Sequence, residues 1–364
     1  MQLLVKFGSG SPKGSGRVAL LLIASVGIVF AQKLPPATRM WSVGPLTKGE
    51  PVMGIAFGAG GATVTAPHAD SQTGSIFAAT HSVVFAGDRI VLTSRVGERR
   101  VEGSQNSETV YQLLSLDVQT GEVKNTREIP ALMVFATNDA HIIVSQDIVS
   151  RDSVMRLTPD LKDAGSFEYQ AEAKKYWRSQ NISPDGSTLG ISTHPGYLLV
   201  DAQTLKTRRL TTDIVEDTSV SSKAVVDEEP SLKDEKGEHS IFHGRCVGRP
   251  VFLSDDLLLT ATCKVARIVD TQGKVLRTIS LHDQVAFAGV SQNGKRFALQ
   301  VASFSGVHST KQERFIIYSV DSGEPVAEVT PEELAEEQSW TAFSPDGSMF
   351  VVGSPLKLTL YRLP

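Results

Sequence analysis

The sequence has little of what several functional classes require. Its formal net charge is only −4 at pH 7 and its isoelectric point is about 6.1. It therefore lacks the basic excess that is typical of proteins that bind nucleic acids or anionic membranes. No second hydrophobic segment of spanning length follows the N-terminal region. We expect no nucleic-acid partner and no membrane association in the body of the chain.

The N-terminal region has the pattern of a secretory signal peptide. Residues 18–31 are small or apolar, and the basic residues before them are Lys6, Lys13 and Arg17. Small residues at the third and first positions before a cut, here Val29 and Ala31, suit signal peptidase. We predict a signal peptide at 1–31, cleaved after Ala31, and a periplasmic or secreted protein. An uncleaved inner-membrane anchor is the alternative, although the run is shorter than the roughly 20 residues of a spanning helix.

Cysteine is nearly absent, with only Cys246 and Cys263 in the chain. They flank two apolar runs, 251–253 and 257–262, that are typical of a hairpin. If the turn is centred after Ser254, the two cysteines face each other across the hairpin. In an exported protein this arrangement predicts a disulfide. Two reduced thiols are the alternative, and a shift of one residue in register would separate the cysteines.

What the sequence does have is a repeated turn. In Ser344-Pro345-Asp346-Gly347, proline fixes φ at the second position and glycine relieves the exit, so the tetrapeptide joins two antiparallel strands. Equivalent positions begin related turns along the chain: Gly87, Thr137, Ser183, Ser254, Ser291 and Ser344. A second turn signal usually follows each copy, as at 117–121, 201–204, 270–273 and 321–323.

Two hairpins in every 40–50 residues or so predict an all-β fold, a β-propeller of six or seven four-stranded blades. The step of 71 residues from Ser183 to Ser254 holds either a hidden seventh unit or a long insertion. We expect an irregular polar insertion around 211–247, as a solvated turn in a degenerate blade or as an acidic interaction loop. The last unit shows only three strands, so an N-terminal strand should complete it. Residues 32–364 would then form a single propeller domain.

The turns at Phe343–Gly347 and Ile182–Gly186 resemble those of the bacterial WD40-like and YVTN-type β-propeller repeat proteins. The resemblance implies a disc of blades around a central channel, with ligands or partners on one face. It carries no catalytic residue onto this sequence. Turn residues next to the innermost strands would line the channel, including Arg178, His282 and Trp340.

Several short patterns resemble binding sites but lack the context that a site needs. The glycine-rich stretch Gly54–Gly61 is not followed by Lys-Ser/Thr or by a helix pattern, as a phosphate-binding loop requires. His68 and Asp70 are only two ligands on a polar loop. His239 and His243 have helical spacing without a helical apolar pattern. We predict no metal site and no cofactor.

Two further patterns could suggest hydrolase chemistry. Ser303–Gly306 lacks the leading glycine of a nucleophile elbow and the strand-to-helix pattern around it. The carboxylates of Pro331–Glu337 could form an acid/base pair, but a solvated helical turn accounts for them equally well. We predict no catalytic residues.

These observations predict an exported, non-catalytic β-propeller that acts as a binding or scaffold module. We expect a protein partner or a small ligand, and a monomer. The alternative is a propeller-type, lactonase-like hydrolase whose site is assembled at the central channel from single residues on separate blades. Metal analysis of the purified protein would distinguish the two.

Overall fold

In the computed structural model the chain divides into two units, Met1–Lys33 and Leu34–Pro364. All of the described residues belong to the second unit. They are 34–44, 80–100, 107–129, 133–148, 151–168, 180–192, 196–210, 219–226, 231–234, 237–240, 250–261, 265–281, 284–302, 314–331, 340–353 and 357–364. Every regular element among them is a β-strand. In this part of the chain no helix has the length and hydrophobicity that crossing a membrane requires.

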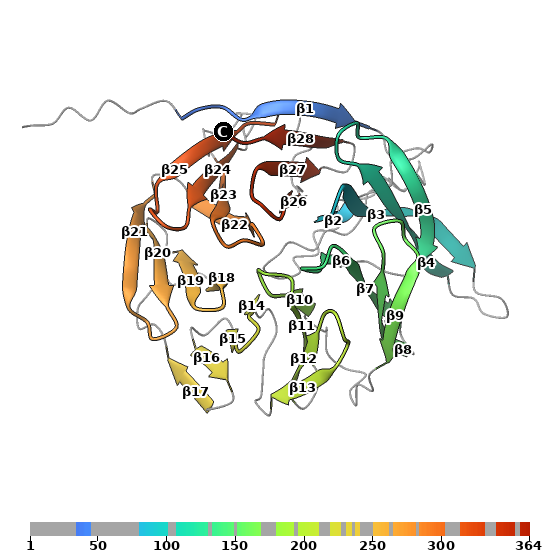
Figure 1. Ribbon diagram of the computed structural model, residues 1–364, viewed down its shortest axis with the longest axis horizontal. Helices are drawn as coiled ribbons and strands as arrows, with labels where there is room; N and C mark the ends of the chain where they lie inside the picture. Colours follow the sequence, from blue (N-terminus) through green and yellow to red (C-terminus); the bar gives the residue numbers. More distant parts are fainter. Residues whose placement is uncertain are drawn as a thin grey trace, which may run out of the picture. The chain divides into compact units, whose positions relative to one another are not determined.

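The second unit consists of seven four-stranded antiparallel sheets, the blades. Blades 1 to 6 are β2–β5, β6–β9, β10–β13, β14–β17, β18–β21 and β22–β25, and blade 7 is β26–β28 completed by β1. At six of the seven junctions between blades the two first strands contact each other, and at the junction of blades 5 and 6 a shared apolar cluster joins the blades. The blades therefore close into a ring (Figure 1). The fold is a seven-bladed β-propeller, which confirms the predicted class and fixes the number of blades.

The first strand of each blade lies innermost. These strands are β2 (Thr80–Ala86), β6 (Met133–Ala136), β10 (Gln180–Ile182), β14 (Ser219–Val220), β18 (Val251–Ser254), β22 (Gln284–Val290) and β26 (Trp340–Phe343). The second strands are β3 (Arg89–Arg100), β7 (Ile142–Ile148), β11 (Thr188–Ser192), β15 (Val225–Val226), β19 (Leu257–Ala261), β23 (Arg296–Ala302) and β27 (Met349–Gly353).

The third strands are β4 (Ser107–Asp117), β8 (Arg151–Leu157), β12 (Tyr197–Asp201), β16 (Ser231–Asp234), β20 (Val265–Asp270), β24 (Arg314–Ser319) and β28 (Leu358–Arg362). The outermost strands are β5 (Val123–Ile129), β9 (Asp163–Glu168), β13 (Thr207–Leu210), β17 (Gly237–Ser240), β21 (Val275–Ser280), β25 (Pro325–Val329) and β1 (Thr38–Val43).

The core lies between the blades, with one apolar cluster at each of the seven interfaces. Successive side chains on a strand point to opposite faces of the sheet. Ile90 and Leu92 therefore pack toward blade 7, whereas Val91 between them packs toward blade 2. Because both faces of each sheet are covered, the second strands are continuous apolar runs such as Ile142-Ile143-Val144.

The closing strand comes from the N-terminal end of the described chain, as predicted. β1 pairs antiparallel with β28, from Thr38 opposite Arg362 to Val43 opposite Leu358. Blade 7 thereby gains its fourth strand, and β1 replaces β28 as the outer edge of the sheet.

Blade 4 occupies the long step between the turns at Ser183 and Ser254. Its four strands, β14 to β17, lie between Ser219 and Ser240. Of the two alternatives for this step, a hidden seventh unit or a long insertion, the structure therefore shows the seventh unit, within 211–247. The blade is degenerate because β14 and β15 have only two residues each.

The hairpin next to the cysteines has a different register from the one assumed above. Val251 lies opposite Leu259 and Phe252 opposite Leu258, one residue away from the register in which Cys246 faces Cys263. The cause is the position of the turn, because Ser254 lies opposite Leu257 and the turn is centred one residue later than assumed. An irregularity between Phe252 and Ser254 recovers only part of this shift. Both cysteines lie outside the described residues, so the disulfide stays a prediction.

Candidate functional site: the turn collar

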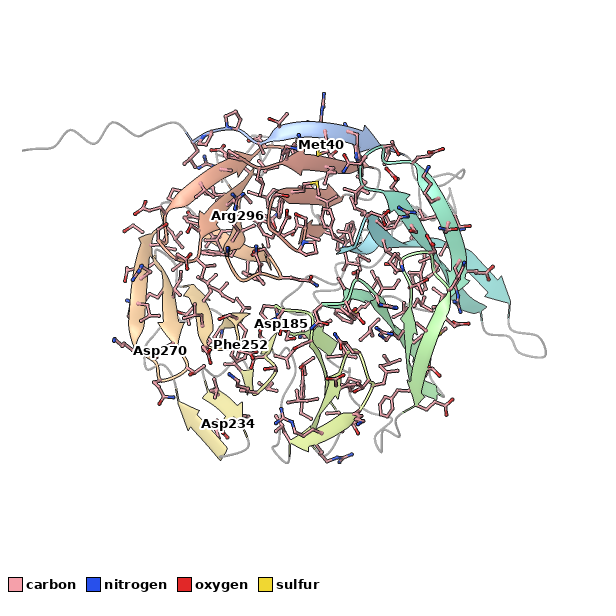
Figure 2. The ribbon with its side chains drawn as sticks, in the orientation of Figure 1. Met40, Asp185, Asp234, Phe252, Asp270 and Arg296 are labelled. Carbon is pink, nitrogen blue, oxygen red and sulfur yellow. The ribbon has the colours of Figure 1, made fainter. Side chains whose placement is uncertain are left out.

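In each blade a short turn rich in polar residues joins the first strand to the second. Since strand direction alternates within a blade, these turns and those between third and fourth strands lie at the same end. We call the inner turns the turn collar, residues 87–88, 137–141, 183–187, 221–224, 255–256, 291–295 and 344–348. Figure 2 shows Asp185 of the collar toward the centre of the ring, whereas Asp234 and Asp270 of third strands lie nearer its perimeter.

The repeated Ser-Pro-Asp-Gly turn is held by a fixed set of hydrogen bonds. In blade 7 the Ser344 hydroxyl donates to the Asp346 carboxylate at 2.6 Å and accepts from the Met349 amide at 2.9 Å. The same carboxylate accepts from the Ser348 amide at 3.0 Å. Gly347 has φ +73°, a left-handed conformation that glycine adopts without strain. The motif is thus a self-capped hairpin turn, which explains why it recurs.

Three other blades repeat this bonding, blade 3 with the same side chains and blades 2 and 6 with different ones. The hydroxyl donates to the carboxylate or amide oxygen two residues later, at 2.6 to 2.7 Å, in the pairs Thr137–Asp139, Ser183–Asp185 and Ser291–Asn293. Polar groups near the channel are therefore largely engaged within their own turns. This gives each turn one fixed conformation.

Two carboxylates of these turns, Asp139 and Asp346, have lowered pKa values. Burial raises the pKa of Asp346, but hydrogen bonds from Ser344 and Ser348 outweigh it and hold that pKa below its ordinary value. Burial likewise raises the pKa of Asp139, while the Thr137 hydroxyl and the Arg156 guanidinium lower it by more. Both carboxylates are therefore ionised at neutral pH, and that of Asp139 is paired with Arg156.

Hydrogen bonds between blades join neighbouring turns into one surface. The Asn138 amide of blade 2 donates to the Gly186 carbonyl of blade 3 at 3.2 Å. The Ser222 amide of blade 4 donates to the Asp255 carboxylate of blade 5 at 2.8 Å. The side-chain amide of Asn293 in blade 6 donates to the Asp346 carbonyl of blade 7 at 2.8 Å. These bonds limit movement of one turn relative to the next.

In blade 2 a hydroxyl and an imidazole of the collar and a guanidinium of β8 surround the Asp139 carboxylate. The Arg156 guanidinium, only 9% exposed, pairs with the Asp139 carboxylate. The His141 Nδ1 atom lies 3.3 Å from the same carboxylate, and the Thr137 hydroxyl donates to it. Hydroxyl and imidazole are therefore both directed at Asp139, not at each other as in a nucleophile–base pair. The arrangement stabilises the turn.

Only one of the three candidate channel residues of the sequence analysis, Trp340, lies among the described residues. Trp340 is 9% exposed and packs into the cluster between blades 7 and 1, so it is a core residue. The expectation that it lines the channel is wrong, because its place on β26 directs it toward blade 1. Arg178 and His282 lie outside the described residues.

Most of the weaker candidates also lie outside the described residues. These are Gly54–Gly61, His68, Asp70, His243, Ser303–Gly306 and residues 332–337. His239 lies on strand β17, so its spacing from His243 does not begin on a helix. Within the described ranges, no three His, Cys, Asp or Glu side chains come close enough to hold a metal ion.

Comparison with known proteins identifies the fold and not a function. No protein-family model matches the sequence, and no curated protein matches it. The structure is similar to that of the Neurospora crassa Pan2 WD40 domain, with a TM-score of 0.53 at 10% sequence identity, over 90% of this chain and 95% of that one. It is also similar to the C-terminal WD40 domain of Sif2, with a TM-score of 0.45 at 12% identity, over 79% and 96% of the chains.

The chain therefore has the fold of a WD40-like β-propeller. Its blades 3 and 7 carry the Ser-Pro-Asp-Gly turn at the collar.

Proposed function

We propose that this protein is an exported, non-catalytic scaffold that binds a protein partner at the turn collar. The observation that carries the proposal is the bonding of neighbouring collar turns across blade boundaries, at Asn138, Ser222 and Asn293. A surface already held in one conformation loses little entropy when a partner binds, which favours association. Proteins with WD40-like folds typically serve as interaction scaffolds, which supports the same function.

The partner is best sought by photo-crosslinking from the exposed collar. Asp88 and Asp256 carry side chains that are 80% and 77% exposed, so a photoreactive residue is tolerated at either position. Val123 and Val275, exposed on outer strands, are the matched controls on the rim. The proposal expects one protein to crosslink from both collar positions and from neither control. Crosslinks from the rim alone, or from no position, would contradict it.

Export is supported by the basic, then apolar, sequence before Ala31. Intact mass spectrometry of protein recovered from the cell envelope or the medium tests it. The expected chain begins at Gln32, and its mass is about two units below the reduced value if Cys246 and Cys263 are joined. A chain that retains residues 1–31 would point to an anchor instead, and two free thiols would remove the disulfide.

The hydrolase alternative has a separate test. A lactonase-like site would require a metal held by convergent side chains at the channel. Metal analysis of the purified protein should find no stoichiometric metal if the scaffold proposal is right. One bound metal ion per chain would favour the hydrolase.

A further inference from the structure

Gln292 departs from the turn motif at the position where two other blades have proline. In blades 3 and 7 the second turn residue is Pro184 or Pro345, which lacks a polar side chain, whereas blade 6 carries glutamine. The Gln292 Nε2 atom donates to the carbonyl oxygens of Ala136 and Thr137, at 3.4 Å each. These carbonyls belong to blade 2, which is not a neighbour of blade 6.

The contact therefore crosses the ring. Blades 7 and 1 separate blade 6 from blade 2 on one side, and blades 3, 4 and 5 separate them on the other. Hydrogen bonds between adjacent turns follow the circumference of the collar, but this one connects opposite parts of it. It places an amide side chain over the channel at the collar end.

A glycine in blade 3 makes room for the amide. A Cβ atom at Gly186 would lie 2.7 Å from Gln292 Nε2 and 2.8 Å from the Asn138 amide nitrogen. Gly186 also has φ +73°, as the turn requires. Three turns, those of blades 2, 3 and 6, thus meet at one point, and two of them are held to each other by the bond from Asn138 to Gly186.

We infer that Gln292 is a cross-ring latch that closes the collar end of the central channel and couples blade 6 to blades 2 and 3. A partner at the collar then meets a continuous polar surface, and entry to the channel from this end requires displacement of Gln292. The latch is a property of the free protein and does not depend on the proposed scaffold function.

Hydrogen–deuterium exchange of the full chain tests the latch in three variants. Gln292→Ala removes the donor, and Gln272→Ala, on an exposed turn of blade 5, is the matched control. A hydrogen bond has a net value of about 0.5–1.5 kcal/mol, so Gln292→Ala should speed amide exchange at 136–141 and 183–188 roughly two- to tenfold. Gln272→Ala should leave both segments unchanged. Equal exchange in the two variants, or an equal increase throughout the ring, would overturn the inference.

Gln292→Glu tests whether a donor is needed. Ionised glutamate has the same shape but only accepts hydrogen bonds, so at pH 7 it faces two carbonyl oxygens and should behave as Gln292→Ala. Acidification through the ordinary pKa of glutamate, about 4.3, restores a donor. Amide exchange at 183–188 in Gln292→Glu should then slow to the rate that Gln272→Ala shows at the same pH. Wild-type protection of Gln292→Glu at pH 7 would contradict the latch.

Discussion

The indole Nε1 atom of Trp41 donates a 2.8 Å hydrogen bond to the Val118 carbonyl oxygen, which joins the closing strand to the neighbouring blade. Trp41 lies on β1 of blade 7, and Val118 lies in the turn after β4 of blade 1. A few residues earlier, the Ala37 amide donates to the Glu328 carbonyl of blade 6 at 3.0 Å. The N-terminal strap, residues 35–43, therefore connects three consecutive blades.

Substitution of Trp41 should weaken ring closure in two steps. Trp41→Phe keeps most of the packing in the cluster between blades 7 and 1 but loses the bond to Val118, at a cost of about 1 kcal/mol. Trp41→Ala also loses the packing, and because the side chain is half-buried we expect about 2 kcal/mol in total. Urea unfolding followed by circular dichroism measures both. Thr38→Ala, at an exposed position on the same strand, should be close to wild type. If all three variants unfolded alike, the strap would not close the ring.

The repeated turn should depend on its hydroxyl more than on exposed serines elsewhere. Ser344→Ala removes the donor to Asp346 and the acceptor of the Met349 amide, so the free energy of unfolding should fall by about 1–2 kcal/mol. Ser322→Ala, on an exposed turn of blade 6, is the matched control and should cost much less. Thermal unfolding compares the two, and an equal loss in both would show that the buried hydroxyl is not special.

Stability should fall with acid because two collar carboxylates, Asp139 and Asp346, have lowered pKa values when folded. The pKa of Asp346 lies below its unfolded value near 3.9, so its ionised form stabilises the fold. This contribution is fully present above the unfolded pKa and disappears as pH falls through the folded pKa. Asp346→Asn should therefore be less stable than wild type at pH 7, and the difference should shrink toward pH 2–3. Unfolding curves that stay parallel at every pH would contradict the assignment.

The junction of blades 4 and 5 should depend on Asp255. Its carboxylate accepts bonds from the Ser222 amide and hydroxyl, whereas Asp256 beside it is 77% exposed. Asp255→Ala should cost about 1–3 kcal/mol, because the Ser222 amide loses its partner, and should speed amide exchange in β14 and β15. Asp256→Ala should change neither. If the amides of β14 and β15 exchanged at the same rate in both variants, the bond from Ser222 to Asp255 would not hold this junction.

The turn motif made most of the ring predictable, since Ser-Pro-Asp-Gly imposes its own hydrogen bonds wherever it occurs. Blade 4 escaped clear recognition because its turn, Ser221 to Ala224, has neither the acid nor the glycine. In this turn the Ser221 hydroxyl accepts a hydrogen bond from the Ala224 amide at 3.0 Å. The carboxylate comes from Asp255 of the next blade, which accepts from the Ser222 amide. A signal divided between two blades is not visible in either repeat.

Neither the register at the cysteine hairpin nor the contact made by Gln292 could be predicted from the sequence, because neither leaves a local pattern. The turn at Asp255–Asp256 moves the pairing in one direction and an irregularity in β18 moves it partly back, and neither changes the apolar pattern. The Gln292 contact joins positions 156 and 155 residues apart, so no local spacing indicates it. The departure from proline at that turn was the available signal, and it acquires meaning only when the ring brings blades 2, 3 and 6 together.

Ring closure by the strap is tested most directly by hydrogen exchange on the intact chain. Backbone pairing of β1 with β28 predicts that amides at 38–43 and 358–362 exchange slowly in wild type, and that both segments exchange faster together in Trp41→Ala. If 38–43 instead exchanged at once, like a free tail, while 358–362 stayed protected, the ring would not be closed by its N-terminal strand.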